Sequence, residues 1–136
     1  MITGINHTTL AVRDLQRALA FYTEILGLRP LVRWEGGAYL LAGEAWLCLS
    51  VDAQARAAPH PDYTHLAFSV SQEAFSALGA ALRAAGARIW KDNRSEGDSL
   101  YFLDPDGHKL ELHVGDLASR LRALREQPYA GLQWFD

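Results

Sequence analysis

The sequence predicts a single α+β domain made of two paired β-α-β-β-β modules, whose strands form a cupped mixed sheet. Two observations lead to this fold class. Apolar and polar stretches follow the same order in both halves of the chain, and a histidine opens the first strand of each half. Repeats of this length indicate that neither unit buries its sheet alone. We place module one at about 1–51, a linker at 52–62, module two at about 63–115, and a C-terminal helix and tail at 116–136.

Length and composition are those of one small globular protein. The chain has 136 residues, 49% of them hydrophobic and 21% charged, which suits one buried core and not two ordinary domains. Its net charge of −3 provides no basic field for nucleic acid, and no stretch is apolar enough to span a membrane. A single cysteine excludes an internal disulfide framework, and the N-terminus lacks the pattern of a signal peptide. We therefore expect a cytoplasmic location and small-molecule partners.

Module one begins with a strand that leads into a helix. The run INHTTLAV at 5–12 has His7 and Thr9 on one face. Asp14 is typical of a helix N-cap, and Gly27 is typical of a helix end. Between them, apolar residues recur at helical spacing, namely Leu15, Leu19, Tyr22 and Leu26. Three strands are then expected, near Arg29–Trp34 and over Ala38–Ala42 and Ala45–Val51.

Module two repeats this order. A strand opens at Tyr63-Thr64-His65 and ends at Val70, and aligning His7 with His65 also matches Val12 with Val70. Ser71 can cap a helix that ends at Gly86 and buries Phe75, Leu78 and Leu82. Strands are expected near Arg88–Trp90, over Ser99–Leu103 and over 109–114.

Two further features complete the second half of the chain. The turn DPDGH between the last two strands sets their register through Pro105 and Gly107. Beyond the last strand, Asp116 is expected to cap a helix with Leu117, Leu121 and Leu124 facing inward.

The strand at 109–114 carries a candidate metal ligand. Lys109, Glu111 and His113 share one face of it. A single half-buried histidine is more often a hydrogen-bonded strand residue than a ligand. His7 and His65, however, occupy the same place in two copies. Together with Glu111 they make two imidazoles and a carboxylate, a set that suits manganese, iron, nickel or zinc and leaves positions open for a substrate oxygen.

Three other residues compete for a place in this site. His113 shares a face with Glu111, and His108 lies on the opposite parity; we leave both outside the ligand set. By the symmetry of the repeat, the counterpart of Glu111 lies near Cys48, where no carboxylate is available. Cys48 is then either a ligand itself or a small hydrophobic residue, and the second reading is favoured.

Four motifs carry a resemblance to a known family: NHTTLAV, AYLLAGEAWLCLS, DYTHLAF and KDNRSEGDSLYFLDPDGHKLELHVGD. With them the chain resembles the vicinal oxygen chelate superfamily, which includes glyoxalases, bleomycin-resistance proteins and dioxygenases, and within it the FosA-type fosfomycin-resistance glutathione transferases. The resemblance covers the whole chain. It implies the vicinal oxygen chelate fold, with a manganese site inside the cupped sheet formed by His7, His65 and Glu111. It also implies addition of the glutathione thiol to the oxirane carbon of fosfomycin, by a homodimer whose metal sites combine elements of both subunits.

A metal alone does not select a phosphonate, so positive charge must meet the anion. From the residues alone Lys91, Arg94 and Arg120 are candidates, and Arg120 and Arg125 flank the leucine face of the last helix equally. The resemblance selects Lys91 and Arg120, with hydrogen bonds from Thr9, Ser95, Ser99 and Tyr101. We expect Tyr39, Trp46 and Tyr63 to line the cavity. Thr9 and Tyr39 are the residues we place at the chemistry, Tyr39 easing deprotonation of the thiol.

The loop at 93–99 has two interpretations. By composition it is an ordinary surface turn, rich in short polar side chains. The resemblance implies a potassium site beside the phosphonate, built from Asn93, Ser95, Glu96, Gly97 and Ser99. Such a cation would stabilise negative charge that develops on the oxirane oxygen.

Three alternatives stay open. A sister enzyme could use another nucleophile: relatives that use bacillithiol carry cysteine where this chain has Thr9, and those that use water carry a glutamate near Gly36-Gly37. A glyoxalase or a ring-cleaving dioxygenase would share only the fold. A non-catalytic, antibiotic-binding protein of this fold would lack the ligand set that His7, His65 and Glu111 provide.

Overall fold

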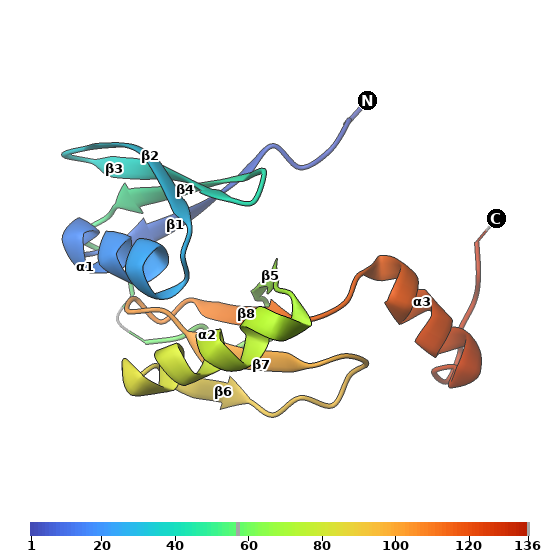
Figure 1. The fold of residues 1–136 in the computed structure, drawn as a ribbon. Helices are drawn as coiled ribbons and strands as arrows, with labels where there is room; N and C mark the ends of the chain where they lie inside the picture. Colours follow the sequence, from blue (N-terminus) through green and yellow to red (C-terminus); the bar gives the residue numbers. More distant parts are fainter. Residues whose placement is uncertain (57, 136) are drawn as a thin grey trace.

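The computed structural model describes residues 1–56 and 58–135 and contains the two predicted modules (Figure 1). Module one comprises β1 (His7–Val12), α1 (Leu15–Ala20), η1 (Phe21–Ile25), β2 (Arg29–Trp34), β3 (Gly37–Ala42) and β4 (Ala45–Val51). Module two comprises β5 (Leu66–Ser69), α2 (Gln72–Ala84), β6 (Ile89–Lys91), β7 (Ser99–Leu103) and β8 (Lys109–His113). The last helix is α3 (Leu117–Glu126).

Each module builds its own four-stranded mixed sheet with the same strand order. The first sheet runs β1-β4-β3-β2 and the second runs β5-β8-β7-β6. In both, the first strand pairs parallel to the last, and the remaining pairs are antiparallel. The predicted repeat and fold class are therefore confirmed. In this chain the strands form two sheets, with β1 and β5 at their edges.

The predicted helix starts are confirmed by their hydrogen bonds. Asp14, Ser71 and Asp116 each accept from a backbone N–H three residues further on, at 3.1, 3.2 and 2.8 Å. These side chains satisfy amides that have no partner inside the helix. Asp116 and Ser119 also form a reciprocal capping box, which makes the start of α3 well defined.

The first helix changes its winding after Ala20. In η1 the backbone is π-helical, and the amide of Leu26 donates to the carbonyl of Phe21, five residues back, at 3.1 Å. The prediction of one regular α-helix up to Gly27 is thus right in extent and wrong in winding. Phe21 and Tyr22, which open this turn, are both buried, with Tyr22 at 0% exposure.

Two other expectations differ from the structure. Strand β5 begins at Leu66, so His65 lies just before the strand instead of opening it. Helix α3 extends away from both sheets (Figure 1), and none of its residues is buried. The prediction that the leucine face of α3 points inward is therefore wrong within one chain. Leu117 is 72% exposed, and Leu121 and Leu124 are half-buried. The predicted linker 52–62 is mostly loop; its residue 57 lies outside the described part of the chain.

The turn DPDGH joins the two modules. Tyr22 donates its hydroxyl to Oδ2 of Asp104 at 2.6 Å, across 82 positions of sequence. The amide of Arg13 donates to Oδ1 of Asp106 at 2.9 Å, and Nε2 of His108 lies 2.7 Å from the carbonyl of Ala11. Oδ1 of Asp104 also accepts from the amides of Asp106 and His108, which closes the turn itself. His108 is thus a structural residue between the modules.

One core cluster spans both modules. It contains Val12, Leu40 and Leu49 from module one and Leu82 and Phe102 from module two, all fully buried. The two modules therefore share one hydrophobic core. Within residues 1–56 and 58–135, the helices are all too short or too polar to cross a membrane.

The buried hydrogen bond between Tyr22 and Asp104 generates a stability prediction. Tyr22→Phe leaves a buried carboxylate oxygen without its donor and should lower the free energy of unfolding by about 1–3 kcal/mol. Urea unfolding at one protein concentration measures this. Tyr129→Phe, which removes an exposed hydroxyl, is the control and should change little.

The destabilisation caused by Tyr22→Phe should depend on pH. Burial raises the pKa of the Asp104 carboxyl, while the hydrogen bond from Tyr22 lowers it. A raised folded-state pKa means that Asp104 favours folding most at low pH, and that this contribution is lost as the pH rises through the folded pKa. Removing Tyr22 raises that pKa further, so the penalty of Tyr22→Phe should be full at neutral pH and shrink in acid. A penalty that is equal at both pH values would contradict this account.

Candidate metal and substrate site

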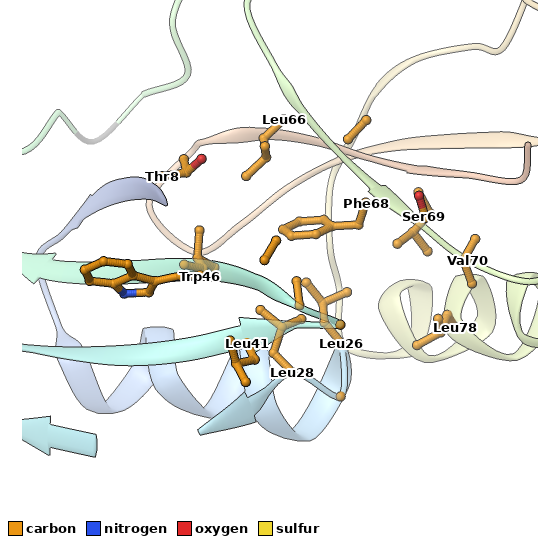
Figure 2. Close-up of a pocket in the computed structure, with 17 residues that line it drawn as sticks. Thr8, Leu26, Leu28, Leu41, Trp46, Leu66, Phe68, Ser69, Val70 and Leu78 are labelled. Atoms are coloured by element: carbon orange, nitrogen blue, oxygen red, sulfur yellow. The ribbon is translucent and has the colours of Figure 1, made fainter. Parts of the chain in front are cut away.

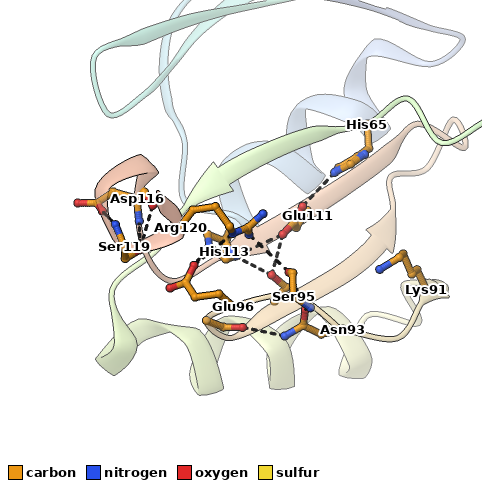
Figure 3. A network of polar contacts seen from close by, with 12 residues as sticks. His65, Lys91, Asn93, Ser95, Glu96, Glu111, His113, Asp116, Ser119 and Arg120 are labelled. Atoms are coloured by element: carbon orange, nitrogen blue, oxygen red, sulfur yellow. Dashed lines mark hydrogen bonds and ion pairs between the residues drawn. The ribbon is translucent and has the colours of Figure 1, made fainter. Parts of the chain in front are cut away.

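His65 and Glu111 form the centre of the site (Figure 3). Glu111 is the middle residue of β8, and it lies opposite Ala67 of the neighbouring strand β5. His65 comes two residues before Ala67, and its Nε2 lies 3.0 Å from Oε1 of Glu111. Glu111 is buried, with 5% of the residue exposed. The parallel pairing of β5 and β8 therefore places an imidazole against a buried carboxylate.

The hydrogen bonds of His65 suit a metal ligand. Its Nδ1 lies 2.8 Å from the carbonyl of Tyr63, and that oxygen can only accept. The proton on Nδ1 is therefore held by the backbone, which leaves Nε2 directed at Glu111. Ligating histidines normally have their second nitrogen fixed in this way. The pair fits two positions of a metal site, which Nε2 of His65 and the carboxylate of Glu111 would provide.

His7, the third predicted ligand, lies on the other sheet. It is exposed at the start of β1, where Nδ1 is 2.7 Å from Oδ1 of Asn6 and the ring stacks on Trp46 at 4.3 Å between centroids. Over residues 1–56 and 58–135, no three His, Cys, Asp or Glu side chains cluster closely enough to hold a metal ion. One chain thus brings together two of the three predicted ligands.

Strand register shows which residue of module one occupies the position of Glu111. In module two, Glu111 pairs with Ala67 on one side and Tyr101 on the other. In module one, Cys48 pairs with Thr9 and Tyr39 in the same way. Cys48 therefore occupies the position of Glu111, as the symmetry of the repeat predicts. Its thiol lies 3.8 Å from its neighbour's carbonyl and is half-buried.

Aromatic rings surround both histidines. Beside His7, Trp46 also makes an edge contact with Tyr39 at 5.0 Å. Beside His65, the rings of Tyr63 and Tyr101 lie at 4.8 and 5.9 Å. The predicted cavity residues are thus divided into two half-sites, one on each sheet. The indole N–H of Trp46 is buried and has no acceptor within the described residues, so an acceptor is still required there.

Lys91 lies at the edge of the half-site of module two. Its ammonium is 4.5 Å from the ring centroid of Tyr101 and 5.7 Å from that of Tyr63. It donates to the carbonyl of Asp92 at 3.3 Å, and it forms no ion pair with a carboxylate among the described residues. This cation next to aromatic faces is available for an anionic ligand.

Arg120 and Arg125 have different surroundings. Arg120 points from α3 to the loop at 93–99, with Nε 3.3 Å from Oε2 of Glu96 and one terminal nitrogen 3.5 Å from Oγ of Ser95. Arg125 lies over the ring of Trp134 at 4.2 Å. The structure therefore places Arg120 near the half-site and Arg125 against the C-terminal tail. Figure 3 shows Lys91 and Arg120 on opposite sides of Ser95.

The loop itself is closed by its own hydrogen bonds. Oδ1 of Asn93 accepts from both the amide and the hydroxyl of Ser95, each at 3.0 Å, and the side-chain amide of Asn93 donates to the carbonyl of Gly97 at 2.8 Å. Ser99, at the end of the loop, donates its hydroxyl to Oε2 of Glu111 at 2.7 Å. The predicted potassium residues are thus gathered in one loop that touches the candidate metal ligand.

Thr9 and Gly37 bear on the choice of nucleophile. Thr9 is exposed on β1, on the same face as His7. A Cβ at Gly37 would lie 2.4 Å from the carbonyl of Leu49, closer than any real side chain comes. Position 37 therefore has no room for a glutamate.

A separate cleft of about 380 Å³ lies between the two modules (Figure 2). Leu66 and Phe68 point into it from module two, and Leu26 and Leu28 line it from module one. Among the described residues that line it, Trp46 is the one predicted site residue, and none has an ionisable side chain. Its chemistry does not suit a phosphonate, so we keep it apart from the half-site at Glu111.

Sequence reasoning missed one member of the site. Nδ1 of His113 lies 2.7 Å from Oγ of Ser99 and 3.4 Å from Oε2 of Glu111. The signal was present, because His113 shares a strand face with Glu111. Sequence alone could not show that Ser99 lies between the two side chains.

Comparison with known proteins agrees with this architecture. Residues 4–112 match the family model of the Glyoxalase/Bleomycin resistance protein/Dioxygenase superfamily. Glutathione transferase FosA of Serratia marcescens is 56% identical, over 97% of this chain and 95% of that protein. Metallothiol transferase FosB of Shouchella clausii is 40% identical, over 89% of this chain and 86% of that protein.

Solved structures give the same result. The fosfomycin resistance protein FosX of Listeria monocytogenes, crystallised as a variant with Mn(II) and 1S,2S-dihydroxypropylphosphonic acid, superposes with a TM-score of 0.80. It is 29% identical, and the match covers 90% of this chain and 98% of that one. The chain therefore belongs to the glyoxalase/bleomycin resistance protein/dioxygenase superfamily and, within it, to the FosA-type fosfomycin-resistance glutathione transferases.

Proposed function

We propose that this protein inactivates fosfomycin by adding the thiol of glutathione to its oxirane ring. The observation that carries the proposal is the His65–Glu111 pair, fixed by a backbone carbonyl, in a chain 56% identical to a glutathione transferase. A new C–S bond forms as the C–O bond of the ring opens, and the freed oxygen takes up a proton. We propose that the reaction takes place in the cytoplasm, where glutathione keeps thiols reduced.

The chain's residues divide the work. His65, Glu111 and His7 would hold manganese or another divalent metal, which when bound supplies Lewis acidity toward the oxirane oxygen. Lys91 and Arg120 bind the phosphonate, and Thr9, Ser95 and Tyr101 orient it by hydrogen bonds. Tyr39, Trp46 and Tyr63 enclose the substrate, and the hydroxyl of Tyr39 eases deprotonation of the thiol. The oxygens of the loop at 93–99 would bind potassium.

We also propose a homodimer with shared sites. His7 lies apart from Glu111 in one chain, and the half-site of module one is open to solvent. Helix α3 extends from the body with Leu117 exposed, which leaves an apolar helix surface uncovered. A second copy related by two-fold symmetry would supply His7 to the first copy's His65 and Glu111, and would receive the same in return.

Water is the second candidate nucleophile, because the FosX variant that shares this fold was crystallised with a dihydroxypropylphosphonic acid, the kind of diol that addition of water to an oxirane would give. Gly36 and Gly37 argue against it, since relatives that use water are expected to carry a glutamate near these positions. Thr9 argues against bacillithiol in the same way, as relatives using that thiol are expected to carry cysteine.

A thiol panel tests the reaction. Purified protein with manganese and fosfomycin should turn over with glutathione and show little product with cysteine, bacillithiol or no thiol, as measured by mass of the adduct. Chelation should abolish turnover without unfolding the protein, because Glu111 stands on a strand that is already packed against an apolar core. Product formed without thiol would favour hydrolysis of fosfomycin. Full activity under chelation would refute the proposed metal dependence.

Mixing inactive variants tests the shared site. His7→Ala and Glu111→Ala homodimers should each be inactive, but an equal mixture after subunit exchange should regain roughly a quarter of wild-type activity. This follows because half of the random dimers carry one intact site out of two. A mixture of His65→Ala and Glu111→Ala, whose ligands lie in the same half-site, is the matched control and should stay inactive. Equal behaviour of both mixtures would place the site within one chain.

Variants of the lysine and the arginines test the phosphonate clamp. Lys91→Ala and Arg120→Ala should each weaken fosfomycin binding about tenfold or more, because each removes a charge-assisted contact of roughly 1.5–3 kcal/mol. Glutathione affinity should change much less. Arg125→Ala, on the same helix but stacked on Trp134, is the control. Isothermal titration measures the affinities. A large loss of fosfomycin affinity in Arg125→Ala with no loss in Arg120→Ala would refute the clamp.

Replacing potassium by sodium should slow turnover without altering manganese affinity.

A further inference from the structure

His113 lies at the junction of the candidate metal ligand and the loop at 93–99. Its Nδ1 is 2.7 Å from Oγ of Ser99, and that hydroxyl is 2.7 Å from Oε2 of Glu111. Its Nε2 faces Oε2 of Glu96 at 4.0 Å. The imidazole side chain is 15% exposed, so the contacts are mostly shielded from solvent. Figure 3 shows His113 between Glu111 and Glu96.

The direction of the protons in this chain of contacts is determined by what each group can donate. A carboxylate only accepts, so the contact between Ser99 and Glu111 uses the single hydroxyl proton of Ser99. The hydroxyl oxygen must then accept from its other neighbour. Nδ1 of His113 therefore carries a proton and donates it to Ser99, whatever the protonation of Nε2. The order is His113 to Ser99 to Glu111.

The loop holds the ring of His113 from the opposite side. A Cβ at Gly97 would meet the carbonyl of Val114 at 2.3 Å and the His113 ring at 3.1 Å, and Gly97 has a φ of +77°. Only glycine adopts that conformation without strain and lets the backbone come this close. The imidazole is thus enclosed between its own strand and the loop, with its Nδ1 edge toward Ser99.

We infer that His113 is a positioning residue that orients Glu111 for metal binding through the hydroxyl of Ser99. The inference rests on the proposed metal role of Glu111 and extends it. Ser99 in this arrangement spends its only proton on Glu111, so its main contribution is to hold the carboxylate instead of binding the phosphonate. Partners that hydrogen-bond a ligand commonly change metal affinity by about 10- to 100-fold when they are removed.

Four variants read by manganese affinity alone test this. The dissociation constant is obtained from the electron paramagnetic resonance signal of free Mn2+, with no substrate present. His113→Asn keeps an N–H donor near the position of Nδ1 and should bind manganese about as tightly as wild type. His113→Leu removes the donor, and His113→Gln moves it to the position of Nε2; both should weaken binding about tenfold or more. His60→Leu, at an exposed histidine, is the matched control and should bind normally.

Ser99→Ala provides a second test of the inference, and it leaves the imidazole ring of His113 in place. It should weaken manganese binding as His113→Leu does, and the double variant should be no worse than either single one, because both changes break the same chain. Thermal unfolding of the metal-free proteins checks that each variant is folded. A variant that does not fold leaves the comparison to Ser99→Ala, which removes one oxygen atom.

The outcomes separate this inference from the proposed function. Loss in His113→Leu and His113→Gln with retention in His113→Asn supports it. Normal affinity in His113→Leu or Ser99→Ala, or an equal loss in His113→Asn, overturns it while leaving the metal site standing if Glu111→Gln abolishes binding. Normal affinity in Glu111→Gln would overturn the metal assignment itself, and this inference with it.

Discussion

A buried carboxylate joins the two halves of this protein. Asp104 closes its own turn through two backbone amides and accepts the hydroxyl of Tyr22 from the other module. A buried charge is tolerated only when hydrogen bonds compensate it, so the turn has one place where it can dock. Burial and the neighbouring Asp104 charge raise the pKa of Tyr22, which keeps its hydroxyl protonated as a donor. Together with the contacts of Asp106 and His108 and the shared core, this hydrogen bond fixes the relative position of the two sheets.

With the modules held in this way, the functional residues divide between two open sheets. His7 with Trp46 stands on one sheet, and His65 with Glu111 on the other. Side chains alternate between the two faces of a strand, and within the described residues of one chain His7 does not join His65 and Glu111 in one cluster. Our proposal of a shared site follows from this constraint: assembly would create the binding site and cover the exposed aromatic surfaces together.

Charge around Glu111 is arranged in a connected network. Ser99 and His113 support the carboxylate from one side, and Glu96 links His113 to Arg120. In a partly buried site such a network can be worth more than its separate contacts. Arg120 is already paired with Glu96, so an incoming anion would have to compete for it, whereas Lys91 lies over aromatic rings. Binding of an anion would therefore have to displace Glu96 from Arg120 but would displace no carboxylate from Lys91 among the described residues.

The sequence by itself determined the repeat, the helix caps, the family and the pairing of His65 with Glu111. These depend on local periodicity and on one parallel strand pair, both of which a sequence pattern encodes. Only the tertiary structure decided the π-helical turn, because it accompanies the burial of Tyr22 against Asp104, 82 residues away. It also decided that His7 stands apart and that α3 extends outward, since no local pattern records which surface a helix will find to cover.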